Sequence, residues 1–159
     1  MALNKLAYLG PRGTFSEEAA MMYDGSLDLV SFSTIDAVGE AVRSRIVDEG
    51  VVPIENSLEG SVNDTLDLLI NQKELYIRWE LILPIEHCLL AKSEVKKREI
   101  MVIYSHPQAL AQSRKYIEKE FPNAQMMASL STAAAVEDMK NSSYISAAIA
   151  PKRAGEIYN

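Results

Sequence analysis

Short apolar runs alternate with amphipathic helical patterns along most of the chain, and this alternation limits the folds that it can form. The first run, Leu6–Leu9, is followed by a Gly-Pro-Arg-Gly break and a stretch in which Phe15, Ala19 and Met22 fall on one helical face. Similar runs before helical patterns occur at residues 29–32, 51–54, 100–104 and 125–128. Strands that alternate with helices predict an α/β fold with mostly parallel sheets.

The middle of the chain breaks this alternation. Residues 76–91 form a long β-prone stretch with few helix signals, which predicts a strand pair or a strand that crosses between two lobes. A chain of 159 residues suits one compact domain or two small lobes.

Composition excludes several classes of partner. The net charge is −6, and the longest basic run is Lys96-Lys97-Arg98, so we expect no nucleic acid partner. No apolar run is long enough for a membrane span, and no secretory signal pattern occurs, so we expect no membrane partner. The single cysteine, Cys88, excludes an internal disulfide, which fits a cytoplasmic location.

Polar residues gather where the predicted strands end and the helices begin. These junctions are Gly10–Thr14, Glu55–Ser61, Ser105–Gln108 and Ser129–Thr132. In α/β sheets, ligands bind beyond the carboxyl ends of the strands, and free N–H groups at helix starts favour anions. Several such ends around one cleft could hold a dicarboxylate, although Ser, Thr and Asn before a helix also serve simply as caps.

The histidines and the cysteine offer little chemistry of their own. Two histidines and one cysteine at these spacings form no zinc pattern, so we expect no metal. His106 precedes Pro107 and fits either a helix cap or a site residue. His87 lies in an apolar run and fits a structural role, and the neighbouring Cys88 lacks the electropositive setting of a nucleophile.

Five motifs resemble one family when they are taken together. They read GPRGTFS, VPIENSLEGSV, SHPQALAQ, STAAA and AAIA, at residues 10–16, 52–62, 105–112, 131–135 and 147–150. In this order, over nearly the whole chain, they resemble the catalytic domain of the prephenate dehydratase family. The resemblance implies a two-lobed α/β fold like the type II periplasmic binding proteins, with the active site in a cleft. Lobe one would comprise about residues 1–71 and 150–159, and lobe two about residues 75–149.

The resemblance also implies an activity. Members of the family convert prephenate, a dicarboxylate, to phenylpyruvate, carbon dioxide and water in L-phenylalanine biosynthesis. The reaction is that of a carbon–oxygen lyase (hydro-lyase) and needs no metal or organic cofactor. By the same resemblance, the protein would be a cytoplasmic homodimer.

Site residues follow from the matching motifs. The resemblance implies catalytic roles for Glu55, Asn56 and Gln108, with Glu55 orienting its neighbours or relaying a proton. It implies that the Gly13-Thr14-Phe15 turn and the helix start at Ser131 and Thr132 bind carboxylate. The remaining residues expected to bind substrate or line its pocket are Ser57, Ser61, His106 and Gln112.

The chain departs from the family pattern in one respect, and two other functions stay open. No Thr-Arg-Phe motif, which carries the family's catalytic threonine, and no phenylalanine-binding ACT domain occur in the 159 residues. The resemblance therefore implies that these residues alone lack appreciable dehydratase activity. The substrate could instead be arogenate, or the chain could be a non-catalytic small-molecule-binding domain of the same fold.

Overall fold

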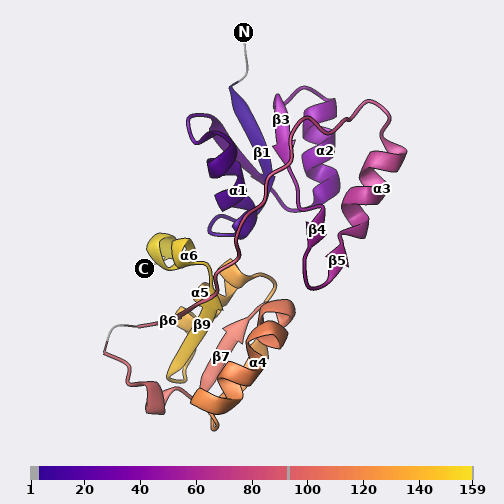
Figure 1. Ribbon diagram of the computed structural model, residues 1–159. Helices are drawn as coiled ribbons and strands as arrows, with labels where there is room; N and C mark the ends of the chain where they lie inside the picture. The colour runs from indigo at the N-terminus through magenta and orange to yellow at the C-terminus, as the bar shows by residue number, and fades with distance from the viewer. Residues whose placement is uncertain (1–3, 93, 159) are drawn as a thin grey trace. The chain divides into compact units, whose positions relative to one another are not determined.

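The computed structural model describes residues 4–92 and 94–158, which form two compact units (Figure 1). Among these residues, 4–11 and 15–84 make the first unit, and 12–14 with 85–92 and 94–158 make the second. Both units are α/β with mostly parallel sheets, so the predicted fold class is confirmed.

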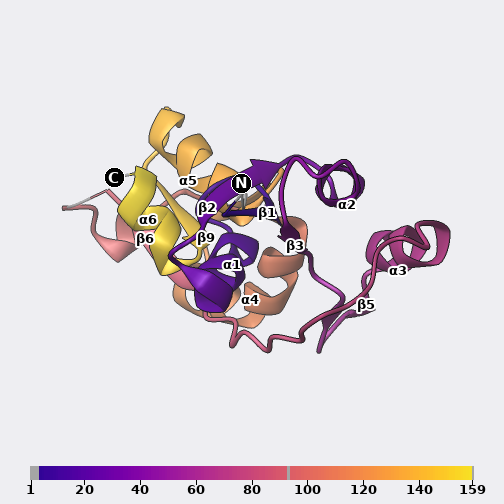
Figure 2. The same cartoon turned by 90° about the horizontal axis from the view of Figure 1, so that it is seen from above.

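The first unit is built on a parallel three-stranded sheet with a helix on each face. Its strands β1 (Lys5–Leu9), β2 (Asp28–Phe32) and β3 (Glu49–Val51) lie in the order β2-β1-β3. Alternate residues of β1 point to opposite faces. Leu6 and Tyr8 pack with Ala20 of α1 (Phe15–Asp24), whereas Ala7 packs with Val38 of α2 (Ile35–Arg43). Figure 2 shows both helices beside these strands.

A hairpin and a third helix complete the regular structure of this unit. The two-residue strands β4 (Glu55–Asn56) and β5 (Gly60–Ser61) pair antiparallel, and α3 (Asn63–Asn71) follows. Buried Leu68 of α3 packs against Gly39 of α2, where a Cβ atom would lie 2.6 Å from Leu68 Cδ1. The absent side chain at Gly39 therefore lets the two helices approach closely.

The second unit has a four-stranded sheet in the order β6-β9-β7-β8. The strands are β6 (Cys88–Ala91), β7 (Val102–Ser105), β8 (Gln125–Ala128) and β9 (Ser146–Ala150), and only β6 runs antiparallel to its neighbour. Ile103 and Ile149 pack on one face with α4 (Pro107–Glu120). Ala148 and Ala150 pack on the other with α5 (Thr132–Asn141) and with Ala154 of α6 (Lys152–Tyr158). A short 3-10 helix, Lys97–Glu99, precedes β7.

Several local expectations need correction. Ser61 does not begin a helix: it lies in β5, and α3 starts after Val62 without a side-chain cap. Of residues 76–91, only Cys88–Ala91 form a strand, and residues 75–87 belong to no helix or strand.

The division into lobes also differs from the expected one. Residues 150–159 were expected to return to the first lobe. In the described residues, α6 instead contacts α5 and β6, and Gly155 lies against Leu90. Small residues on α6 and β9 allow this close packing within the second unit. No helix in residues 4–92 and 94–158 is long and apolar enough to cross a membrane.

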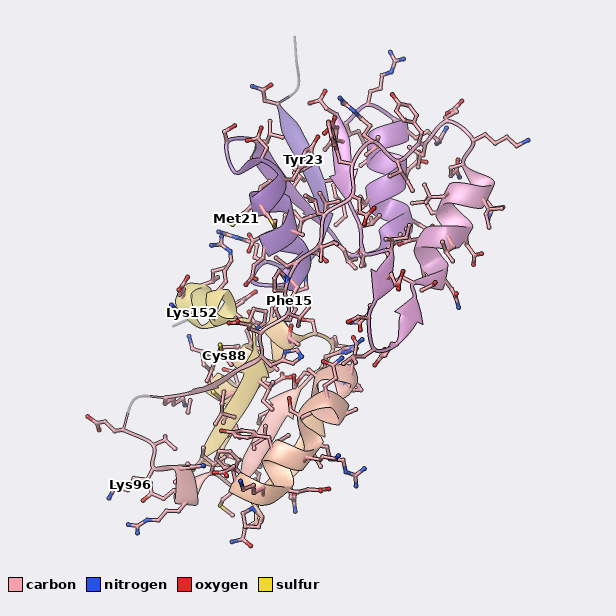
Figure 3. The ribbon with its side chains drawn as sticks, viewed as in Figure 1. Phe15, Met21, Tyr23, Cys88, Lys96 and Lys152 are labelled. Carbon is pink, nitrogen blue, oxygen red and sulfur yellow. The ribbon has the colours of Figure 1, made fainter. Side chains whose placement is uncertain are left out.

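Tyr23 of α1, which is labelled in Figure 3, donates a hydrogen bond to Glu49 of β3, and Glu49 also binds Arg78. That bond, followed by burial, raises the pKa of Tyr23 above its ordinary value of 10.0. Because the raised pKa favours the neutral phenol, the stabilisation is present below pH 10 and is lost as pH rises through the folded-state pKa.

We therefore expect Tyr23→Phe to lower the free energy of unfolding by about 0.5–1 kcal/mol at neutral pH, since one partly exposed hydrogen bond is removed. Urea unfolding of parent and variant at pH 7 and at a pH above 10 measures the difference. The difference should shrink at the higher pH. A constant difference would show that the phenol proton has no part in the effect.

Candidate functional site

The β4–β5 hairpin presents four of the predicted site residues. Glu55 pairs with Ser61 and Asn56 pairs with Gly60, whose φ of +85° is in the left-handed region that favours glycine. Ser57 lies in the connecting turn, and Glu55, Ser57 and Ser61 are all exposed. The hairpin thus offers a carboxylate, an amide and two hydroxyls on one short loop.

The Asn56 side chain is held by its oxygen. Oδ1 accepts a hydrogen bond from the Leu58 N–H at 2.9 Å, which is an Asx turn. Its Nδ2 has no hydrogen-bond partner in the described part of the chain, so a fixed donor is available to a ligand. Thr65, which is buried, donates to the Pro53 carbonyl at 2.6 Å and anchors α3 to the base of the hairpin.

Two other predicted junctions lie side by side in the second unit. β7 and β8 are parallel neighbours, with Ser105 opposite Ala128, and the Ser129 N–H donates to the Ser105 carbonyl at 2.8 Å. The starts of α4 and α5 therefore lie at the same edge of the sheet. Buried Ser105 is a structural residue, because its hydroxyl donates to the Ile149 carbonyl at 2.6 Å.

The start of α4 carries His106, Gln108 and, one turn further, Gln112. His106 is the N-cap, and its Nδ1 accepts from the Gln108 N–H at 3.4 Å. The Gln112 Oε1 lies 2.9 Å from the Nε2 of His87, which precedes β6. The apolar run around His87 predicted a structural role and gave no sign of this contact, since Gln112 lies 25 residues away in the sequence.

α5 begins at the residue where the sequence predicts a helix start. Ser131 is the N-cap, and its hydroxyl accepts from the Ala134 N–H at 2.9 Å. The first N–H groups of a helix have no partner inside it. Those of Thr132 and Ala133 can therefore face an anion, in the favourable field of the helix dipole.

Loss of the Ser131 cap should be measurable. We expect Ser131→Ala to lower the free energy of unfolding by about 1 kcal/mol, because the Ala134 N–H loses its partner. Ser131→Asn, which preserves a cap acceptor, should cost only a few tenths of a kcal/mol by comparison. Urea unfolding followed by circular dichroism checks both, and equal losses in the two variants would contradict the role of the cap.

The turn at residues 12–14 belongs to the second unit, whereas Phe15 begins α1 in the first. Buried Gly13 has a φ of +81°, and a Cβ atom there would lie 3.1 Å from Ala154 Cα and 3.2 Å from Tyr158 Cε2. The Tyr158 hydroxyl donates to the Arg12 carbonyl at 3.1 Å. Only glycine fits this turn without strain, and α6 holds the turn in place.

The structure therefore groups the predicted residues in two sets. The first unit holds Phe15 and the hairpin residues Glu55, Asn56, Ser57 and Ser61. The second unit holds the turn residues Gly13 and Thr14 together with His106, Gln108, Gln112, Ser131 and Thr132. Cys88, half-buried in β6 opposite Ala150, adds nothing to either set (Figure 3).

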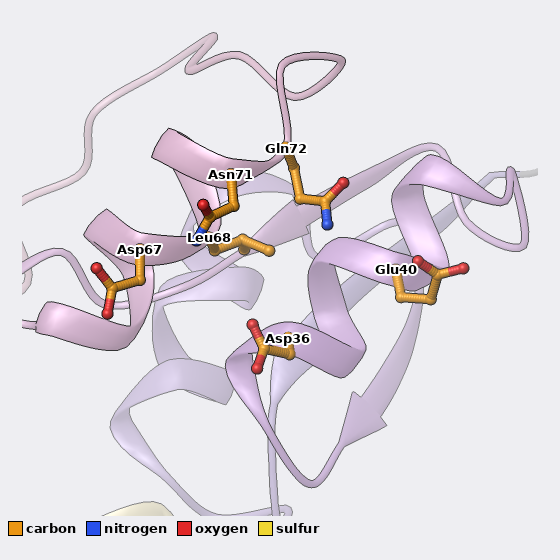
Figure 4. A pocket seen from close by; sticks show the side chains of 6 residues that line it. All are labelled: Asp36, Glu40, Asp67, Leu68, Asn71 and Gln72. Atoms are coloured by element: carbon orange, nitrogen blue, oxygen red, sulfur yellow. The ribbon is translucent and has the colours of Figure 1, made fainter.

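Two hollows in the first unit are unsuitable for a dianion. One, of about 370 Å³, lies between α2 and α3 and is lined by Asp36, Glu40, Asp67, Leu68, Asn71 and Gln72 (Figure 4). Its three carboxylates would repel a dicarboxylate, and the hydrogen bond from Arg43 lowers the pKa of Glu40 and keeps it charged.

The other hollow, of about 470 Å³, lies at the amino end of β1 and includes Asn4, Lys5 and Trp79. It also contains three carboxylates, those of Asp24, Asp48 and Glu49. Ligands of parallel sheets bind at the carboxyl ends of the strands, so this hollow is at the wrong end. Neither hollow contains a predicted site residue.

Comparison with known families identifies the chain's relatives. The family model of prephenate dehydratase matches residues 6–159, which is nearly the whole chain. The chain belongs to the prephenate dehydratase family. The motifs that carry the predicted site all lie inside the matched range.

Individual relatives agree with this assignment. Prephenate dehydratase of Lactococcus lactis subsp. cremoris is 44% identical over 156 residues, covering 98% of this chain and 55% of the relative. Arogenate dehydratase 5 of Arabidopsis thaliana is 39% identical over 155 residues, covering 97% of this chain and 36% of the relative. The chain thus spans about half the length, or less, of these prephenate and arogenate dehydratases.

A solved member of the family shares the fold. The crystal structure of prephenate dehydratase from Arthrobacter aurescens, in complex with L-Phe, superposes with a TM-score of 0.89 at 33% identity. The superposition covers 96% of this chain and 52% of that one. The arrangement of strands and helices described above is therefore that of a prephenate dehydratase.

Proposed function

We propose that the protein catalyses the decarboxylating dehydration of prephenate to phenylpyruvate, a step of L-phenylalanine biosynthesis. The observation that carries the proposal is the match to the dehydratase family over residues 6–159, with the predicted site motifs in order. The proposal assigns substrate contacts to the hairpin of the first unit and to the helix starts of the second.

The reaction depends more on how the protein positions the substrate than on a reactive side chain. The bond between the ring and its carboxylate breaks and releases carbon dioxide, and the electron pair enters the ring as the hydroxyl leaves with a proton as water. Formation of the aromatic ring drives the reaction. The protein has to hold both carboxylates, remove water from the leaving carboxylate and protonate the leaving hydroxyl.

The described geometry suggests how the roles are divided. The N–H groups of Thr132 and Ala133 bind a carboxylate at the start of α5, together with the Gly13-Thr14 turn. Asn56 donates from Nδ2, and Gln108 hydrogen-bonds the substrate from the first turn of α4. Glu55 orients its neighbours or relays a proton toward the leaving hydroxyl, and general acid catalysis of that step contributes about 10²–10⁴ in rate. His106 lines the substrate pocket. Ser57, Ser61 and Gln112 complete the polar lining.

Turnover of prephenate and of arogenate tests the proposal. Residues 1–159 would be fused to the part of the Lactococcus lactis relative that follows the matched region, because that relative is 44% identical to this chain. We expect this fusion to form phenylpyruvate with a higher kcat/KM than it shows for arogenate. A higher kcat/KM for arogenate would show that arogenate, the substrate in the Arabidopsis relative's name, is the substrate in place of prephenate. Binding of prephenate without turnover would indicate a non-catalytic binding domain.

We also propose that the protein acts in the cytoplasm as a homodimer. A single cysteine, free and half-buried, suits a reducing compartment. The resemblance to the family implies self-association. Light scattering over a range of protein concentrations measures the molecular mass of the protein in solution. A constant monomer mass at all concentrations would contradict the dimer.

A further inference from the structure

The start of β6 lies at the edge of the second sheet where the predicted site residues gather. β6 runs antiparallel to β9, and its first residue, Cys88, pairs with Ala150, the last residue of β9. Because β9, β7 and β8 are parallel, the start of β6 lies at the carboxyl ends of these three strands. Ligands of such sheets bind at that edge. His87, which directly precedes β6, is therefore brought to the same edge as the starts of α4 and α5.

The alternation of side chains along β6 directs His87 toward α4. Residues two apart in a strand point to the same face of the sheet. Leu89 packs with Leu110 in the cluster that α4 covers, so His87 is expected on that face as well. The contact agrees with this expectation: the Nε2 of His87 lies 2.9 Å from the Oε1 of Gln112, one turn after Gln108 on α4.

The hydrogen bond between His87 and Gln112 has one sense only. A glutamine Oε1 accepts and cannot donate, so the proton must be on the Nε2 of His87. His87 is half-buried and is followed at once by a paired strand, whereas Gln112 is exposed. The imidazole therefore sets the orientation of the longer, more exposed amide. With its oxygen held, Gln112 turns its NH2 group, which has two donors, away from His87.

Two other amides of the predicted site show what this orientation provides. Asn56 has the same arrangement, since its Oδ1 is held by the Leu58 N–H and its Nδ2 is the group assigned to the substrate. The side chain of Gln108 makes no hydrogen bond within residues 4–92 and 94–158, so its amide can present either end to a ligand. An amide that is held by its oxygen offers only donors, and donors suit a carboxylate.

We propose that His87 is a positioning residue of the dehydratase site, which turns the Gln112 amide so that its NH2 group donates to a carboxylate of the substrate. This role deepens the proposed function and rests on it, because the ligand is prephenate. Since the amide is oriented before the substrate binds, less side-chain freedom is lost on binding. His87 lies outside the five motifs that carry the family resemblance, so the motifs alone assign it no role.

Removal of each partner, in the fusion to the Lactococcus lactis relative, tests this role. Gln112→Met keeps the length of the side chain but has no N–H, and it should raise the KM for prephenate by about tenfold or more, because hydrogen bonds to charged groups are the stronger ones. His87→Leu leaves the amide in place but releases it, and should raise the KM by about three- to tenfold. The double variant should have the KM of Gln112→Met, because His87 acts only through Gln112.

Three further variants separate positioning from a structural link between β6 and α4. Gln112→Glu keeps an acceptor for His87 but has no donor, so its KM should rise while its urea midpoint stays at that of the parent. His87→Gln has an amide N–H in place of the imidazole N–H, and should restore most of the KM that His87→Leu loses. Gln108→Met is the matched control one turn earlier on α4, and its effect on KM should multiply with that of His87→Leu.

Selective ¹⁵N labelling of histidine gives a readout that does not depend on turnover. The neutral imidazole of His87, identified by the loss of its signals in His87→Leu, should carry its proton on Nε2. A proton on Nδ1 would overturn the inference, since the Gln112 nitrogen would then face the ring.

The kinetic results can contradict the inference in two further ways. Effects of His87→Leu and Gln112→Met that multiply would show that His87 does not act through Gln112. An unchanged KM with a lower urea midpoint in both variants would show that the bond only ties β6 to α4. An inactive parent fusion would reject the proposed function itself, and with it the substrate contact of Gln112, whereas the first two results reject the role of His87 in an active enzyme.

Discussion

Asn56→Ala should slow the formation of phenylpyruvate from prephenate by about 10²–10³-fold, the usual effect of removing one donor that stabilises the transition state. The Nδ2 group of Asn56 is fixed by the bond between Oδ1 and the Leu58 N–H, and it has no other partner among the described residues. A donor that is already oriented costs no reorganisation when the substrate's charge shifts. The assay follows phenylpyruvate formation by the fusion to the Lactococcus lactis relative.

Asn56→Asp separates the donor from the turn. Aspartate keeps an oxygen for the Leu58 N–H and preserves the Asx turn, but it has no N–H to donate. We therefore expect this variant to slow turnover as much as Asn56→Ala, while its urea midpoint stays at that of the parent. If Asn56→Ala lost activity only through loss of stability, or if either variant stayed within a few-fold of the parent, Asn56 would be a turn residue alone.

Features that depend on neighbouring residues could be predicted from the sequence. Ser131 before an Ala-rich stretch and Pro107 after His106 both mark helix starts, because capping involves groups only two or three residues apart. Short apolar runs before helical patterns likewise located β1, β2, β3, β7 and β8 to within a few residues.

Features that depend on residues far apart in the chain could not be predicted from the sequence. The β4–β5 hairpin has only two residues in each strand, too few for a periodic signal, so Ser61 was taken as a helix start. The contact between His87 and Gln112 exists only once β6 and α4 are placed in the same unit. Residues 75–87 have the composition of a β-strand but form none. Composition gives only the β-propensity of a segment, whereas a strand also needs a neighbouring strand to pair with.

The site could be predicted in part for the same reason. Sequence motifs named the residues, and the structure shows the local geometry of each group, such as the donor at Asn56 and the N–H groups at Thr132 and Ala133. A helix cap and an anion-binding helix start look alike in sequence, because both use Ser or Thr before the helix. The activity and unfolding measurements on the Asn56 variants distinguish a catalytic role from a structural one at that residue.

Ile103→Ala should lower the free energy of unfolding of the second unit by about 2–5 kcal/mol, a large share of the about 5–15 kcal/mol that stabilises a typical domain. Ile103 lies in β7, between β9 and β8, and is fully buried with Ile117 and Phe121. Removing its side chain leaves a cavity. β7 cannot move to close it, because β7 is hydrogen-bonded to β9 on one side and to β8 on the other. Urea unfolding followed by circular dichroism measures the loss.

Two further variants calibrate this result. Ile103→Val, which removes one methylene, should cost about 0.5–1.5 kcal/mol. Met101 lies just before β7, and its side chain is 54% exposed. Met101→Ala should therefore lower the free energy of unfolding by less than about 0.5 kcal/mol. A loss below about 1 kcal/mol for Ile103→Ala would show that the sheet relaxes around the cavity.

Since β7 ends at Ser105 and leads directly into His106 and Gln108, this core also fixes one edge of the proposed site. Loss of Ile103 should therefore lower stability and activity together, whereas loss of the Asn56 donor should lower activity alone.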